Sequence, residues 1–493
     1  MNKKKTKDNN AVAAGIQLNK KTVLMISILA VLLVLVAGVL SHVIPQGEYT
    51  SSSIVDEVEI FDPDSYVQLE DQQPLAWWKI LLSPILALNP ANDYFLTGII
   101  IVVFVVVIGG TFLIVDECGV LKYIMGIVVE KFSKKKYFLL ALIVFICMLL
   151  SSTAGILEEA ITLVPIAVAI SLALGWDSLV GLGMSLIAVA FGFTAATFNP
   201  FNVVTIQKMA GLEIYSGLAF RIIVFLVVYA ILTAFLILYA KRIEKNPQKS
   251  LSYESDLQMR DKYPIDICRE AMQDKRIAKA SKAFGICLAC VFLLIALDFI
   301  LDMGGTISSA AMPVMFALGA VFAAYFSGMS RKDFFRNFGK GIKTILPILP
   351  FFVLILAIIY VLTEGLILPT ILHSAYQHIQ HLNPYICILV IFFIIMALEF
   401  FIGSGSIKAL LTMPVILPLA NMLGITGQSV ILAFCLGDGF TNLLYPTSGI
   451  MIIAIGMVGV SYRKWLKFTA PLFIAEFVAS VIFMLLAIAT NYV

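Results

Sequence analysis

The stretch that decides the fold is Ser151-Ser152-Thr153-Ala154-Gly155, a small polar cluster that interrupts the apolar run 137–175. A second cluster, Gly403-Ser404-Gly405-Ser406, interrupts the apolar run 385–424. A helix over 137–150 is about 21 Å long, which reaches the middle of a ~30 Å bilayer core without crossing it. We therefore expect both runs to form re-entrant hairpins whose tips line a cavity inside the membrane.

The composition is that of a membrane protein. Of the 493 residues, 60% are hydrophobic and 13% are charged, and the mean hydropathy is +0.98. Soluble domains contain roughly 45–50% apolar and ~25% charged residues, which cover the outside of the globule. This composition excludes a soluble enzyme, a nucleic-acid binder and a disordered chain. Continuous apolar runs also argue against a β-barrel, so we expect an all-α polytopic membrane protein.

Nine further apolar runs are long enough to cross a bilayer core, which takes about 20 helical residues. They lie at about 22–44, 94–115, 179–206, 217–240, 283–301, 306–327, 344–363, 428–460 and 468–490. The long crossings 179–206 and 428–460 contain Gly and Pro near their middle, and we expect broken helices there. Arg221, near the start of the crossing 217–240, is expected to extend its charged end towards the membrane surface.

The basic residues orient the chain by the positive-inside rule. The N-terminal tail 1–21 is rich in lysine and the charged linker 241–282 holds eleven Lys and Arg, so both are expected in the cytoplasm. The loop 45–93 holds nine acids and one basic residue and is expected outside. Nine crossings then place the C-terminus outside. We expect a multi-pass protein of the plasma membrane, surrounded by membrane lipid.

The two halves of the chain correspond at a fixed offset, since Pro165 and Pro414, and Gly175 and Gly424, are both 249 residues apart. The first repeat is 22–240 with the hairpin 137–175, and the second is 306–493 with the hairpin 385–424; the helix 283–305 connects them. The first hairpin follows Lys134-Lys135-Lys136 and enters from the cytoplasm, whereas the second enters from outside. An inverted repeat with broken helices is the architecture of secondary transporters.

Several motifs resemble those of a known family. They are Ser-Ser-Thr-Ala-Gly-Ile-Leu-Glu-Glu-Ala (151–160), Asn-Pro-Phe-Asn (199–202), Gly-Ser-Gly-Ser (403–406), Leu-Gly-Asp-Gly-Phe-Thr-Asn-Leu (436–443) and Tyr-Pro-Thr-Ser-Gly (445–449). Over nearly the whole chain the sequence resembles the YfcC-like family, which is grouped with anaerobic C4-dicarboxylate carriers and basic amino-acid exchangers in the ion-transporter superfamily. The resemblance implies a homodimer in which a transport domain moves like an elevator against a scaffold domain.

Small polar residues at the two tips and the two breaks form the candidate site for a small-molecule substrate. Helix N-termini there favour a substrate carboxylate, and unwound carbonyls with side-chain oxygens suit Na⁺ near the tips, the one metal ion we expect. The alternative is that these small residues pack helices together. The candidate substrate-binding residues are Ser151, Ser152, Thr153, Gly155, Asn199, Asn202, Gly403, Ser404, Gly405, Ser406, Thr441, Asn442, Thr447 and Ser448.

Three acids in or beside these segments are candidates for holding a substrate ammonium or a coupling ion, because a carboxylate inside a bilayer needs a cavity or a partner. They are Glu158, Glu159 and Asp438. The first two also suit the N-terminal turn of a helix, so stabilisation of that turn is their alternative role. Lys408 follows the second tip and can pair with a substrate carboxylate or with one of the three acids. Glu399, one turn before that tip, is a weaker candidate for the site.

These features favour a secondary transporter or exchanger over an ion channel or an enzyme. Channels usually build a filter from several subunits, whereas the repeat builds a midplane site within one chain. We find no G-x-x-x-x-G-K-[ST] phosphate loop and no evident Asp pair for an intramembrane protease, and expect no catalytic residue. Acids at the site favour basic amino acids, with C4-dicarboxylates as the alternative substrate. We expect no cofactor other than a coupling Na⁺ or H⁺.

The distribution of Lys and Arg predicts the outcome of a topology experiment. A reporter fused after Lys249 is expected to report the cytoplasm, and one fused after Val493 the opposite side, because five of the nine predicted crossings lie between the two positions. Two reporters on the same side would contradict the nine-crossing topology.

Overall fold

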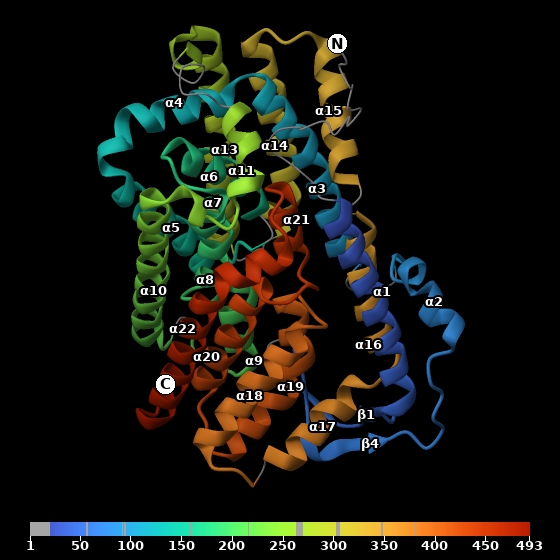
Figure 1. The fold of residues 1–493 in the computed structure, drawn as a ribbon. Coiled ribbons are helices and arrows are strands. Elements are labelled where there is room, and N and C mark those ends of the chain that lie inside the picture. Colours follow the sequence, from blue (N-terminus) through green and yellow to red (C-terminus); the bar gives the residue numbers. More distant parts are fainter. Residues whose placement is uncertain are drawn as a thin grey trace.

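The computed structural model describes residues 20–55, 58–90, 92, 95–157, 160–214, 216–262, 270–301, 306–346, 349–379 and 381–493 (Figure 1). Most of these residues are helical. Between the first two long helices the chain forms two small antiparallel pairs. Strand β1 (Gly47–Tyr49) pairs with β4 (Tyr66–Gln68), and β2 (Ser52–Val55) pairs with β3 (Val58–Phe61).

The helices of the first half follow the predicted runs. They are α1 (Lys20–Val43), α2 (Trp77–Leu86), α3 (Phe95–Glu117), α4 (Val120–Phe132), α5 (Lys136–Ala154), α6 (Ala160–Ala173), α7 (Ser178–Leu182), α8 (Ala188–Thr194), α9 (Thr205–Met209) and α10 (Leu218–Lys245), with π-helical segments η3 (Gly183–Ile187) and η4 (Pro200–Val204). The linker that follows contains α11 (Tyr253–Lys262).

The second half of the chain is also mostly helical. Its helices are α13 (Lys275–Ile300), α14 (Thr306–Ser327), α15 (Arg331–Ile345), α16 (Leu349–Glu364), α17 (Leu368–Ile379), α18 (Pro384–Glu399), α19 (Gly405–Met422), α20 (Gly427–Asp438), the short 3₁₀ segment η7 (Phe440–Leu443), α21 (Gly449–Met457) and α22 (Tyr462–Ala489). Short 3₁₀ turns also occur at Pro63–Ser65, Ser133–Lys135 and Pro247–Lys249.

Several of the predicted crossings are single long helices, among them α1 and α3. Among the described residues, α5, α10, α19 and α22 are long and apolar enough to cross. The segments Leu356–Glu364 and Leu368–Ser374, bent by 72°, would give a fifth span if counted together. The total of nine full crossings stays a prediction. The predicted crossings 179–206 and 428–460 are instead divided into short helices, because Pro200 and polar side chains end the regular hydrogen bonding there.

The first leg of the hairpin 137–175 is longer than predicted. Helix α5 has 19 residues and continues through the polar cluster to Ala154. It does so because the hydroxyl groups bond locally: Thr153 Oγ1 donates to the Leu149 carbonyl (2.7 Å), and Ser151 Oγ donates to the Ile156 carbonyl (2.6 Å). The helix ends at Gly155, whose φ of +72° is the left-handed conformation that glycine adopts without strain. The prediction that this leg ends at residue 150 was wrong.

Helices from the two halves pack against each other in a reciprocal way. Helix α1 lies along α16 at one side of the molecule, and α14 and α15 lie along α3 (Figure 1). In the larger core, α6 contacts α21, and α19 contacts η4 and α9. Each half therefore contributes to the surroundings of the other half's broken segments. Helices α1, α2 and α16 share a second hydrophobic cluster, which also includes Ile402 and packs against α19. The main core contains α5–α10 and α18–α22 together with parts of α3, α4, α13 and α14.

The linker after α10 is attached to the main core by two buried acids. Ser250 Oγ donates to Asp177 Oδ2 (2.7 Å), and the same oxygen accepts from Tyr239 (2.8 Å). Asp256 Oδ2, on α11, accepts from the Ser178 backbone N–H (2.9 Å), while Asp256 Oδ1 has no partner among the described residues. Burial raises the pKa of Asp256 to about 6. The ionised carboxylate is therefore disfavoured in the attached state.

The raised pKa predicts how Asp256→Asn changes stability. A carboxyl whose folded pKa is raised destabilises the fold increasingly as pH rises from the unfolded value of 3.8 to about 6. The variant retains an oxygen for the Ser178 N–H. Its free energy of unfolding, followed by thermal unfolding, is therefore expected to exceed that of wild type by up to about 3 kcal/mol at about pH 8 and to converge with it below about pH 4.

The control for this measurement is Glu254→Gln on the same helix, because the Glu254 side chain is exposed. It is expected to show no pH-dependent gain. A midpoint for Asp256→Asn that is lower than wild type at every pH would contradict the role given to this carboxyl.

Candidate functional site

Both long crossings are interrupted at corresponding places. In the first half, α8 ends at Thr194 and the chain is non-helical until Pro200. Asn199 caps the next segment, since its Oδ1 accepts the Phe201 backbone N–H (2.9 Å). In the second half, α20 ends at Asp438, and α21 begins at Gly449 after a short 3₁₀ turn. These interruptions leave backbone groups and polar side chains inside the main core.

The tip after α5 contacts the break in the first half. Ser152 Oγ donates to the Ala195 carbonyl (2.7 Å) and accepts the Thr197 backbone N–H (3.0 Å). Gly155 lies against Asn199, because a Cβ added to Gly155 would come within 2.6 Å of Asn199 Oδ1. Ser152 is 0% exposed, so its hydroxyl holds the tip to the break.

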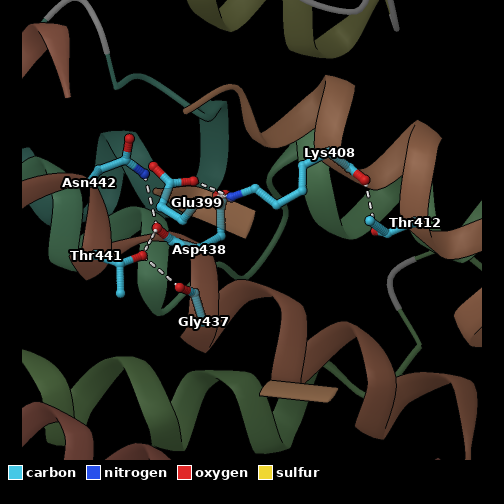
Figure 2. Close-up of polar contacts among 7 residues, drawn as sticks. All are labelled: Glu399, Lys408, Thr412, Gly437, Asp438, Thr441 and Asn442. Carbon is cyan, nitrogen blue, oxygen red and sulfur yellow. Dashed lines mark hydrogen bonds and ion pairs between the residues drawn. The ribbon is translucent and has the colours of Figure 1, made fainter. Parts of the chain in front are cut away.

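The tip before α19 contacts the break in the second half through a lysine. Lys408 Nζ lies between the carboxylates of Glu399 and Asp438 and forms an ion pair with each (Figure 2). Glu399 is the last residue of α18 and Asp438 the last of α20, so three helices meet at one ammonium. The ends of these helices are held by further bonds: Thr412 Oγ1 donates to the Lys408 carbonyl (2.7 Å), and Asn442 Nδ2 donates to the Asp438 carbonyl (2.9 Å).

The two breaks also touch each other. A Cβ added to Gly439 would collide with the backbone nitrogen of Thr194, and a Cβ on Gly405 would contact the ring of Phe193 at 3.4 Å. Segments far apart in the sequence thus meet beside the lysine: the end of α8, the start of α19 and the end of α20. No hydrogen bond joins the two tips directly in the described part of the chain. The tips are connected through the breaks, because each tip contacts one break and the two breaks contact each other.

The Glu399–Lys408–Asp438 triad has one more acid than base. Lys408 and Asp438 are 0% exposed and Glu399 is 2% exposed. Two carboxylates and one ammonium have a formal charge of −1 when all are ionised. Burial of an uncompensated charge is unfavourable by several kcal/mol even in a relaxed protein. Asp438 Oδ2 is a buried triad oxygen without a hydrogen-bond partner in the described part of the chain.

Unpartnered donors lie at the break in the first half. Asn199 Oδ1 accepts the Phe201 N–H and Asn202 Oδ1 accepts the Val203 N–H (2.7 Å), which fixes how both amides are turned. Asn199 Nδ2 and Asn202 Nδ2 are buried and have no acceptor among the described residues. In the second half, Ser404 and Ser448 stand at the N-caps of α19 and α21 with no capping hydrogen bond from their side chains.

The other predicted site residues have local roles or are partly exposed. Thr441 Oγ1 donates to the Gly437 carbonyl (2.6 Å), and Ser151 and Thr153 bond within the end of α5. Thr447 is buried, whereas Gly403 and Ser406 are half-buried. Glu158 and Glu159 lie outside the described residues. In the described part of the chain, no group of three His, Cys, Asp or Glu side chains is placed to hold a metal ion, and Na⁺ binding by other oxygens stays a prediction.

Arg221 has more protein partners than the sequence predicted. Its side chain is 2% exposed, so it is buried inside the protein. It donates to the Thr197 carbonyl (3.2 Å), to Gln428 Oε1 (2.7 Å) and to the Ser216 carbonyl (2.7 Å), so it joins the first break to the start of α20. The sequence did contain a signal for this burial. Arg221 is a single charged residue inside a long apolar run, and such residues usually face the protein interior.

Known proteins resemble this chain over most of its length. The family model described as "DcuC: C4-dicarboxylate anaerobic carrier" matches residues 23–489. A relative from Escherichia coli (strain K12), "Putative basic amino acid antiporter YfcC", is 28% identical over 401 residues, covering 78% of this chain and 76% of the relative. An "Uncharacterized protein" of Haemophilus influenzae (strain ATCC 51907 / DSM 11121 / KW20 / Rd) is 26% identical over 372 residues, covering 76% of this chain and 72% of that protein. The crystal structure of the Alcanivorax borkumensis YdaH transporter aligns with 96% of this chain and 99% of its own, at 16% identity and a TM-score of 0.44.

Two neighbouring glycines provide a matched test of the triad's geometry. A Cβ added to Gly405 would lie 2.7 Å from Asp438 Oδ2, whereas one added to Gly403 would lie 3.8 Å from Glu399 Oε1, an ordinary contact. Gly405→Ala is therefore expected to displace Asp438 or the start of α19 and to lower stability by about 1–3 kcal/mol, measured by thermal unfolding. Gly403→Ala is expected to unfold like wild type. Equal midpoints for the two variants would show that Asp438 is not held against this tip.

Proposed function

The chain belongs to the C4-dicarboxylate anaerobic carrier family, which confirms the resemblance drawn from its motifs, and we propose that it is a secondary exchanger for basic amino acids. Its membership of this family and its long apolar helices make it an integral membrane transporter. In the proposal, the substrate binds where the two breaks meet, beside the Lys408 triad, and crosses by alternating access.

The observation that carries the proposal is that the buried triad has two acids for one base, which leaves a formal charge of −1 when all three are ionised. A basic amino acid such as arginine has one net positive charge at neutral pH, which cancels the formal charge of the triad. A C4-dicarboxylate would instead add two negative charges to it. Because charge separation in a buried site is unfavourable, the cationic substrate gives the most stable occupied state. The E. coli relative is named for basic amino acids, which supports the same assignment.

The same charge supports exchange rather than one-way transport. An empty site would carry its uncompensated charge through the membrane interior, and this raises the barrier for the return of the empty carrier. A site filled by a cationic amino acid is neutral and returns more easily. The carrier would then change sides mainly when loaded, which is the behaviour of an obligatory exchanger.

The substrate's carboxylate needs its own donors, and the first break offers them. The unpartnered amides of Asn199 and Asn202 can each donate to a carboxylate oxygen. The uncapped N-termini of α19 and α21, at Ser404 and Ser448, add partial positive charge in the second half. We propose that these groups bind the carboxylate while Asp438 Oδ2 accepts from the substrate's cationic end.

C4-dicarboxylates remain the second candidate because the family is described by them and because Lys408 and the two amides are suited to anions. This alternative requires that at least one triad carboxyl be protonated.

We further propose a homodimer in the plasma membrane with a cytoplasmic N-terminus, and elevator-type movement of the main core.

A counterflow experiment tests the substrate assignment. Purified protein in liposomes loaded with unlabelled arginine is expected to accumulate labelled arginine, and loading with succinate is expected to give none. Asp438→Asn retains the size of the side chain and removes its charge. It is expected to weaken apparent arginine affinity ten- to a hundredfold, since a charged hydrogen bond contributes roughly 1.5–3 kcal/mol.

The control variant is Asp333→Asn, whose carboxylate forms a surface pair with Arg336. It is expected to transport like wild type, because surface pairs contribute about 0–1 kcal/mol. Counterflow with succinate and none with arginine would replace the proposed substrate by a dicarboxylate. Unchanged arginine affinity in Asp438→Asn would remove this carboxylate from the binding site.

A further inference from the structure

Glu476, near the middle of α22, is a second buried acid that the triad does not use. It is 0% exposed, and neither carboxyl oxygen has a hydrogen-bond partner among the described residues. Ser480 lies one helical turn further on, is also 0% exposed, and has an unpartnered hydroxyl. Residues four apart share a helix face, so three unpartnered oxygen atoms lie along one strip of α22. Buried polar groups without partners are rare in native proteins, and a bound ion or proton is one of the ways in which they are satisfied.

The surroundings of Glu476 are apolar. Phe473, one turn earlier on α22, packs against Phe191 of α8 and Phe440 of η7, and Phe477 packs against Phe392 of α18. Helix α22 also contacts α10 and α20. An ionised carboxylate in such surroundings has neither water nor a donor to stabilise it.

The charged groups on the helices around α22 are engaged elsewhere or lie at another depth. Arg221 of α10 bonds to Thr197, Gln428 and Ser216, and the acids of α18 and α20 pair with Lys408. Phe220 packs on Phe483, and Phe235 packs on Phe468. Because Glu476 lies between Phe468 and Phe483 on α22, it is level with the middle of α10 and away from the charged end of α10. The titratable and charged residues on these elements are Arg221, Tyr229, Tyr239, Lys241, Arg242, Glu244, Lys245, Tyr385, Cys387, Glu399, Cys435 and Asp438, and α21 carries none.

We propose that Glu476 is a proton-binding site and that the exchanger changes sides readily only when this carboxyl holds its proton. The proton comes from water, forms an O–H bond with one carboxylate oxygen and returns to water when it leaves, and Ser480 is the nearest polar neighbour on the same face. A neutral carboxyl can cross the membrane interior with the main core, whereas an ionised one adds an uncompensated charge. Exchange should therefore slow as pH rises.

This proton site is distinct from the substrate site, although the two are neighbours. Phe440 follows Asp438 by two residues and packs on Phe473, so an aromatic pair lies between the segment that ends in Asp438 and the turn that holds Glu476. A cation at the triad and a proton at Glu476 therefore occupy different places. The functional part of the inference rests on the proposed exchange, whereas protonation of Glu476 can be measured without any substrate.

Infrared spectroscopy of the protein in liposomes tests protonation directly. Wild type at neutral pH is expected to show a protonated-carboxyl stretching band that is absent from Glu476→Gln. Glu213→Gln, in an exposed loop, is the matched control and is expected to retain the band. An identical band in wild type and Glu476→Gln would show that Glu476 is ionised and would overturn the proposal.

Arginine exchange at equal pH on both sides tests the consequence. In wild type the rate is expected to fall with rising pH, approaching tenfold per pH unit above the pKa of a single required proton. Glu476→Gln, which is permanently neutral, is expected to lose this alkaline fall and to exchange at the wild-type rate at low pH. The same alkaline fall in Glu476→Gln would overturn the role in exchange. No arginine exchange by wild type at any pH would contradict the proposed function instead, and the infrared band would still decide the proton site.

Discussion

The ammonium of Lys408, shared between two carboxylates that are closed off from water, constrains much of what surrounds it. Glu399 and Asp438 are the last residues of α18 and α20, and Lys408 lies in the first turn of α19, so the ion pairs fix where three helices meet. Gly405 must be glycine for Asp438 to approach the tip. Because the triad has one more acid than base, its geometry also decides which ligand can stabilise it. The local structure and the proposed substrate preference thus follow from the same three side chains.

The second constraint is that broken helices inside a membrane protein must find partners for their free backbone groups. Side chains provide several of them: Asn199 caps η4, Ser152 bonds to Ala195 and Thr197, and Asn442 bonds to the Asp438 carbonyl. What remains unpartnered is informative for that reason. The amides of Asn199 and Asn202 lack acceptors, while Asp438 Oδ2 and Glu476 lack donors among the described residues. A substrate with one anionic and one cationic end, together with a proton, would satisfy these groups.

The sequence was sufficient to locate the polar clusters and the breaks, because Gly, Pro and small hydroxyl residues stand out inside long apolar runs and weaken regular helix there. It did not predict that α5 continues to Ala154, since composition does not reveal that Ser151 and Thr153 bond within the helix end. Nor did it predict that both Glu399 and Asp438 form ion pairs with Lys408. The number of residues across a helix break does not determine the direction in which the chain continues. It also did not predict that carbonyls of distant loops converge on Arg221. The predictions for Glu158 and Glu159 stay open, as both lie outside the described residues.

We propose that the site requires positive charge on its substrate. Arginine and citrulline have nearly the same shape, but the guanidinium of arginine is charged and the ureido group of citrulline is neutral. Calorimetric titration of the purified protein with each compound therefore isolates the charge. We expect arginine to bind about ten- to a hundredfold more tightly than citrulline, because it can form one charged hydrogen bond to a buried carboxylate. Equal affinities for the two compounds would contradict this proposal.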